Sequence, residues 1–193
     1  MTPQDDMLHR LYTAPPQKVL IVLITLLVAA AVFDIRNRRI PNWLTISGVL
    51  LGFAINFGIG PPEGGVLFAL QGFLAGFGLY MLLYVLRAMG AGDVKLMGAV
   101  GALVGWERWF GIFFVTAIVG GLMAIALVVA RGRLKRTLFN VGFILSEMKL
   151  GRPAYVEKEE LDVRSPKAVG LPHGAVIAIA TIFFLAFAAR LSQ

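Results

Sequence analysis

Long apolar stretches, separated by short polar connections, dominate this 193-residue sequence. A helix needs about 20 mostly apolar residues to cross the hydrocarbon core of a bilayer. Six stretches meet or approach that length, at about residues 19–33, 43–60, 65–86, 89–106, 109–130 and 169–189. We therefore expect an all-α, polytopic membrane protein with six transmembrane helices, forming a single membrane-embedded domain over residues 1–193.

The composition supports a membrane protein. Hydrophobic residues make up 58% of the chain and charged residues only 15%, whereas soluble domains carry roughly a quarter charged residues. This balance excludes a soluble enzyme, a disordered tail and a nucleic-acid-binding domain. The net charge of +7 is better explained by topology signals and contacts with membrane lipid. The sequence has no cysteine, which excludes disulfides, cysteine nucleophiles and cysteine-based zinc sites.

The distribution of Lys and Arg predicts the orientation. If the connection after the first stretch faces the cytoplasm, fourteen Lys and Arg residues lie inside and four lie outside. Cytoplasmic connections carry the excess of basic residues, so we expect a protein of the cytoplasmic (inner) membrane with both termini outside. The first stretch also resembles a signal-peptide core, with Ala29-Ala30-Ala31 as a cleavage site. Cleavage there would export the following arginines against the charge rule.

The longest polar segment, residues 131–168, is predicted to be a cytoplasmic loop. After a cluster of basic residues, apolar side chains recur at helical spacing: Leu134, Leu138, Val141, Leu145 and Met148. This pattern is typical of an amphipathic helix on the membrane surface. Such a helix either docks a substrate or simply connects the last two spans.

Two aspartates stand out because both are expected at the cytoplasmic edge of the membrane. Asp34 closes the first apolar stretch, and Asp93 opens the fourth after two intervening crossings. Two carboxyl groups in a poorly solvated niche do not both ionise readily and instead share a proton. That state suits amide hydrolysis by general acid–base catalysis. His9 and His173 are far apart in sequence, so we expect no metal and no cofactor.

The positions of the two aspartates are also compatible with a structural role. Asp34 precedes several arginines and Asp93 precedes Lys95, so each carboxylate can form a structural ion pair. The chain is alternatively a non-enzymatic membrane subunit, an inactive scaffold of an assembly platform, or a small transporter that binds an ion or proton. Transporters more often place such acids near the bilayer midplane than at one edge.

Two local sequences add a resemblance. Residues 90–97 read Gly90-Ala91-Gly92-Asp93-Val94-Lys95-Leu96-Met97, and residues 33–42 read Phe33-Asp34-Ile35-Arg36-Asn37-Arg38-Arg39-Ile40-Pro41-Asn42. The first resembles the GxGDxK signature of prepilin peptidases, which are membrane aspartyl proteases, and the second resembles the first aspartate motif of that family. Leu171-Pro172-His173-Gly174 resembles the family's late Pro-x-Gly turn. Presenilin-type proteases share GxGD, but their Pro-Ala-Leu motif is absent here.

The resemblance implies a membrane aspartic endopeptidase with Asp34 and Asp93 as its catalytic pair. Its substrates would be precursors of type IV prepilins, Flp-type pilins or pseudopilins, cleaved at the cytoplasmic membrane face, with pilus-assembly proteins as further partners. Substrate-binding or supporting roles would fall to five residues: Gly90, Gly92, Lys95, Asn42 and Arg36. Alternatively, the glycines serve helix packing, Lys95 anchors its helix at the interface, and Asn42 caps the second span.

One feature of the family is missing. Its larger members carry an N-terminal domain with paired CxxC motifs and also methylate the new N-terminus. The sequence has no cysteine and thus resembles the short peptidases of tight-adherence pili or the archaeal preflagellin peptidases, so methylation is not expected.

Overall fold

The computed structural model describes residues 14–60, 64–149 and 171–191. Within these ranges the regular elements are all α-helices: α2 (Gln17–Asn37), α3 (Asn42–Ile59), α4 (Val66–Val85), α5 (Ala91–Ala130), α6 (Leu134–Lys149) and α8 (His173–Leu191). The prediction of an all-α chain is therefore confirmed for the part of the chain that is described. Five of these helices, all except α6, are long and apolar enough to cross a membrane.

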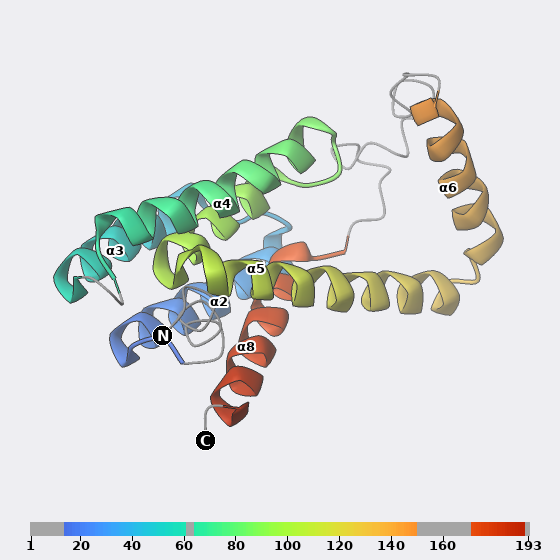
Figure 1. Ribbon diagram of the computed structural model, residues 1–193. Helices are drawn as coiled ribbons and strands as arrows, with labels where there is room; N and C mark the ends of the chain where they lie inside the picture. Colours follow the sequence, from blue (N-terminus) through green and yellow to red (C-terminus); the bar gives the residue numbers. More distant parts are fainter. Residues whose placement is uncertain (1–13, 61–63, 150–170, 192–193) are drawn as a thin grey trace.

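Helix α5 is the central element of the bundle. It contacts α2, α3, α4, α6 and α8, and Figure 1 shows α2, α3, α4 and α8 gathered around its first part. Every residue from Leu96 to Gly105 is buried. A helical segment that is apolar on all sides must be enclosed by other elements, so the bundle is assembled around this segment.

Glycines bring α4 and α5 into direct backbone contact. A Cβ atom on Gly72 would overlap the carbonyl oxygen of Gly101, and a Cβ atom on Gly76 would overlap the carbonyl oxygen of Met97. In lipid, helices associate through close packing rather than through a hydrophobic driving force, and small residues permit the required approach. Gly72 and Gly76 on α4 and Gly101 on α5 therefore allow the two helices to pack in direct backbone contact.

The direction of α5 reverses at Gly105, which has φ +79° and ψ 170° inside the helix. Before this residue α5 runs antiparallel to α4, as the glycine contacts show. After it α5 runs parallel to α4, because Phe68 of α4 meets Gly105 and Tyr80, further along α4, packs against Trp109 and Phe113 with centroids 6.4 and 6.2 Å apart. Glycine adopts a positive φ at no steric cost, and a Cβ atom here would also overlap the ring of Phe68.

The carbonyl groups of the last turn before the reversal accept hydrogen bonds from side chains of α3 and of α5 itself. The Asn56 side-chain amide donates to the carbonyl oxygens of Ala102 at 2.9 Å and Leu103 at 3.3 Å. The Arg108 guanidinium donates to the carbonyl oxygen of Val104 at 3.4 Å. Carbonyl groups at a helix end lose their intrahelical partners, and buried ones need replacements. Asn56 therefore fixes the end of α3 against the turn of α5.

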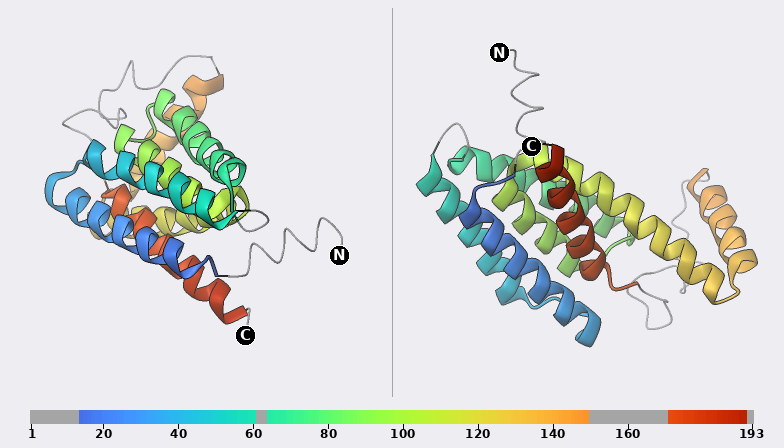
Figure 2. Two further views of the ribbon diagram at one scale, coloured as in Figure 1. Left: turned by 90° about the vertical axis from the view of Figure 1, so that its left-hand side faces the viewer. Right: turned by 90° about the horizontal axis from the view of Figure 1, so that it is seen from below.

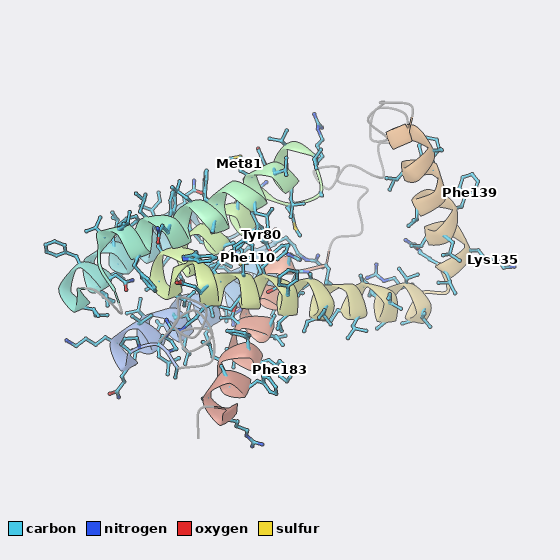
Figure 3. All side chains as sticks on the ribbon, viewed as in Figure 1. Tyr80, Met81, Phe110, Lys135, Phe139 and Phe183 are labelled. Atoms are coloured by element: carbon cyan, nitrogen blue, oxygen red, sulfur yellow. The ribbon has the colours of Figure 1, made fainter. Side chains whose placement is uncertain are left out.

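Beyond the bundle, α5 continues as an apolar arm. Its last buried residue is Thr116, and the side chains on its remaining turns are largely exposed, including Ile118, Leu122, Ile125 and Val129. Helix α6 follows at the far end of this arm, away from α2, α3, α4 and α8 (Figure 2). Lys135 and Phe139 project from α6 (Figure 3). Much of the predicted loop, residues 150–168, lies outside the described residues.

A substitution at the α4–α5 contact tests this packing. Gly72→Ala should lower the unfolding temperature of the detergent-purified protein, because its methyl group forces the two backbones apart at a cost of about 1–3 kcal/mol. Gly78→Ala is the matched control on the same helix, since its Cβ atom would meet nothing within 4 Å. Equal unfolding temperatures for both variants would contradict the close contact.

Candidate active site

Asp34 lies in the last turn of α2, with only 8% of its surface exposed. The helix ends at Asn37 because Arg38 adopts the left-handed conformation, and the Arg38 N–H donates to the Asp34 carbonyl oxygen at 2.9 Å. A short connection then leads to α3, which starts at Asn42 directly after Pro41. This tight turn brings the end of α2 and the start of α3 to one place.

Asp93 is the third residue of α5. Gly90 precedes the helix in an extended conformation, and its N–H donates to Asp93 Oδ2 at 3.3 Å. An acidic side chain in the first turn interacts favourably with the helix dipole. Gly92 faces the connection between α2 and α3, because an added Cβ atom would lie 3.3 Å from Ile40 Cβ. The small residue thus allows the start of α5 to approach that connection.

The two aspartates, which are distant in sequence, line one cavity of about 490 Å³. Of the predicted supporting residues, Gly90, Gly92 and Asn42 also line this cavity. The remaining lining residues are Arg38, Arg39, Ile40, Pro41 and Ala91.

The last apolar helix also reaches this site. The Gly174 N–H, in the first turn of α8, donates to Asp34 Oδ2 at 2.7 Å. N–H groups at a helix N-terminus lack intrahelical partners and carry partial positive charge, so they bind anions. A Cβ atom on Gly174 would lie 3.1 Å from the same oxygen. The residue that resembled the glycine of the late Pro-x-Gly turn therefore contacts the first aspartate.

Two predicted supporting residues lie outside the lining of this cavity. The Lys95 amino group donates to Asn42 Oδ1 at 2.8 Å, and Lys95 lines a second cavity of about 230 Å³ with mainly apolar residues of α3 and α4. The Arg36 side chain is exposed. The hydrogen bond from Lys95 joins the starts of α3 and α5, whereas Arg36 is not among the residues that form the aspartate cavity.

Sequence reasoning placed Arg38, Arg39 and Gly174 in motifs but gave none of them a role in the site. The two arginines belong to the first motif, so their position was a usable signal. Tyr80 lies within an apolar stretch and carries no pattern, and Figure 3 shows it inside the bundle, with its ring centroid 6.4 Å from that of His173. His173 was considered for a metal site and as part of the late turn motif, and the structure places it directly before Gly174, whose N–H donates to Asp34 Oδ2.

Paired carboxyl groups in a shared cavity can perform general acid–base chemistry. One group in its ionised form accepts a proton from water, and the other in its protonated form donates to the substrate. Within the described ranges, no group of three or more His, Cys, Asp or Glu side chains is arranged to hold a metal ion. The arrangement therefore offers carboxylic acid chemistry.

Comparisons with known proteins identify the matching part of the chain. The sequence model of the type IV leader peptidase family matches residues 21–125, which include both aspartates. Among similar proteins is a prepilin leader peptidase/N-methyltransferase of Myxococcus xanthus, 32% identical over 120 residues. Proteins of the same name from Aeromonas salmonicida and Neisseria gonorrhoeae are each 30% identical, over 116 and 118 residues.

These similarities cover part of each protein. Each match covers 58% of this chain and 35%, 40% and 41% of the three relatives, respectively. The chain therefore matches less than half the length of these curated relatives. No solved structure matches. Because the family model covers more than half of the chain, this protein belongs to the type IV leader peptidase family.

Proposed function

We propose that this protein is a membrane aspartic endopeptidase that removes the leader peptide from type IV prepilin-like precursors, such as Flp-type pilins or pseudopilins. The observation that carries the proposal is the shared cavity of Asp34 and Asp93. Membership of the peptidase family and the relatives' names support the same activity. Prepilin precursors are the proposed partners, with pilus-assembly proteins as further ones.

The hydrogen bond at Asp34 guides the assignment of the general base and the general acid. The N–H of Gly174 donates to Asp34 Oδ2 and fixes the direction of that carboxyl group, and we assign Asp34 as the general base. Asp34 takes a proton from water while the water oxygen bonds to the scissile carbonyl carbon. Asp93, protonated, then donates its proton to the amide nitrogen as the C–N bond breaks. The leader leaves with a new carboxyl group, and the mature protein gains a new amino terminus.

The residues around the pair have supporting roles in this proposal. Gly90 and Gly92 keep the start of α5 free of side chains, so that an extended peptide backbone can approach Asp93. The hydrogen bond between Lys95 and Asn42 holds the second and fourth apolar stretches in register beside the cavity. Arg36, on the exposed side of α2, contacts the substrate outside the cavity or the lipid headgroups.

We further propose six membrane crossings. The two parts of α5 run in opposite directions along α4, so each part is taken as a separate span with Gly105 at the turn. From the excess of Lys and Arg on one side, we propose that the protein lies in the inner membrane with both termini outside and the aspartates at the cytoplasmic face. Helix α6 would then lie on the inner surface of the membrane.

Replacing either aspartate tests the mechanism. Asp34→Asn and Asp93→Asn should each reduce leader removal by at least about 1,000-fold, because an amide can neither accept the water proton nor supply one. Cleavage is followed on a gel after co-expression with a panel of prepilin, Flp-type and pseudopilin precursors. The matched control is Asp6→Asn, the same change outside the two motifs. Near-normal cleavage by Asp34→Asn or by Asp93→Asn would show that the replaced aspartate is structural.

A chelator separates the proposed chemistry from metal-dependent hydrolysis. Leader removal by the purified enzyme should continue at an unchanged rate in excess EDTA, because two carboxyl groups complete the reaction without a Lewis acid. Carboxylates bind divalent ions weakly as hard oxygen ligands, so added Mg²⁺ or Ca²⁺ is expected to inhibit if it has any effect. Activity that is lost in EDTA and restored by zinc would refute the aspartic mechanism.

Cysteine labelling tests the topology. Because the sequence has no native cysteine, each single-cysteine variant carries one thiol at a known position. A membrane-impermeant thiol reagent added to intact spheroplasts should label Glu63→Cys and Arg190→Cys but not Asn37→Cys. All three should react after the membrane is made permeable. Labelling of Asn37→Cys from outside would invert the orientation. Protection of Arg190→Cys together with Asn37→Cys would indicate five crossings instead of six.

A further inference from the structure

A groove of about 230 Å³ lies between α3 and α4 and shares no lining residue with the aspartate cavity. Its walls come from these two helices: Thr45, Ile46, Val49 and Leu50 of α3, and Phe73 and Phe77 of α4. The Ile46 and Leu50 side chains are 53% and 64% exposed, so the groove is open at the surface of the bundle. Among the described residues that line it, Lys95 of α5 is the only charged one. We call this feature the Lys95 groove.

The charged end of the Lys95 groove lies where α3 and α5 begin. The Lys95 amino group donates at 2.8 Å to Oδ1 of Asn42, the first residue of α3. From there α3 runs in the same direction as the first part of α5, because a Cβ atom on Gly52 would lie 3.0 Å from Ala102 Cβ. The apolar walls therefore extend from the Lys95 end along the apolar turns of the helices. In the proposed topology, the Lys95 end is at the cytoplasmic edge of the membrane.

The Lys95 amino group can bind an anion while it keeps its contact with Asn42. An ammonium group carries three N–H donors, and Asn42 Oδ1 accepts one of them. The Thr45 hydroxyl donates to the Asn42 carbonyl oxygen at 3.1 Å. Lys95 is half-buried, and hydrogen bonds between charged groups are roughly twice as strong as neutral ones. The groove thus offers a positive charge at one end and apolar surface along the rest.

The order of these features matches the order of head and tail in a phospholipid. A small soluble anion would leave the apolar walls uncovered, and an uncharged lipid would leave the ammonium without an anionic partner. Basic pockets between helices at the cytoplasmic side of a membrane bind anionic lipid headgroups. We propose that the Lys95 groove binds one anionic phospholipid of the membrane, with the phosphate on Lys95 and an acyl chain along α3 and α4. This inference goes beyond the proposed peptidase function and does not depend on it.

Native mass spectrometry of the detergent-purified full chain tests the binding. The probes are phosphatidylglycerol, which is anionic, and phosphatidylcholine, which is zwitterionic, with identical acyl chains. The wild type should bind one phosphatidylglycerol about fivefold more tightly than phosphatidylcholine, the effect of one basic side chain near an anionic headgroup. Lys95→Gln should lose this preference, and Lys95→Arg should keep it. Equal affinity of the wild type for the two lipids would overturn the proposal.

Two matched controls separate the groove from general attraction of anionic lipid. Arg36→Gln removes an exposed cation that does not line the groove, and it should keep the preference. Val49→Phe fills the groove and should weaken the binding of phosphatidylglycerol, whereas Leu51→Phe fills a neighbouring apolar pocket between α2 and α3 and should not. An equal loss in Arg36→Gln and Lys95→Gln would refute the role of the cation. An equal loss in Val49→Phe and Leu51→Phe would refute the role of the groove.

Thermal unfolding provides a second readout. The groove is built from α3, α4 and α5, and a ligand that binds only the folded state stabilises it by mass action. Phosphatidylglycerol should therefore raise the unfolding temperature of the wild type by about 2–4 °C more than phosphatidylcholine does, and this difference should disappear in Lys95→Gln. The same unfolding temperature of the wild type in both lipids would contradict the proposal.

Photocrosslinking in native membranes identifies the occupant. A photoreactive phenylalanine derivative in place of Ile46, on the open side of the groove, should form an adduct with phospholipid whether or not a prepilin precursor is co-expressed. An adduct with the precursor instead of lipid would assign the groove to the substrate and overturn the proposal, and so would an adduct with a second copy of this chain. Because none of these experiments measures cleavage, failure of lipid binding is distinguishable from failure of the proposed peptidase function.

Discussion

The backbone contact between α4 and the first part of α5 determines the rest of the architecture. Because Gly72 meets Gly101 and Gly76 meets Met97 without intervening side chains, α5 is held in one register along α4. A slip of one helical turn would move the start of α5 by about 5.4 Å and carry Asp93 away from Asp34. The same contact leaves room for α3 and α8 to enclose α5. Packing deep in the bundle therefore controls the geometry at the aspartate cavity.

Much of the fold was predictable because the signal for a membrane helix is local. The expected stretches at 19–33, 43–60 and 65–86 correspond to α2, α3 and α4 with small differences at the ends. The expected break between the stretches 89–106 and 109–130 lies close to the reversal at Gly105, but no local feature distinguishes this glycine from the other 21 as the one with a positive φ. Its position depends on Asn56 and Phe68, which contact this part of α5 only after α3 and α4 have packed. The number of crossings consequently rests on tertiary structure more than on apolar length.

The candidate site also contains residues that the sequence predicted and residues that only the tertiary packing brings in. Asp34 and Asp93 were found from sequence because an acidic residue at the edge of an apolar stretch is rare and because both lie in short motifs. The contact of Gly174 with Asp34 was not predicted, although Gly174 lies in a short motif, and the place of Tyr80 against the ring of His173 had no local signal. They arise where α4 and α8 meet α5, and only the packing of the helices brings them together. The hydrogen bond from Lys95 to Asn42 likewise replaced the pairing with Asp93 that sequence proximity suggested.

The hydrogen bond between Gly174 and Asp34 joins the first and the last of the described helices. A ribosome delivers helices to the membrane in order, so α2 is inserted long before α8 has been synthesised. Throughout that interval the Asp34 carboxylate is without the N–H donor that stabilises it. The nascent chain thus lacks this contact at the candidate site until α8 has been inserted. Under the proposed peptidase function, a chain truncated before α8 would keep both aspartates but would lose the one contact that ties Asp34 to the last described helix.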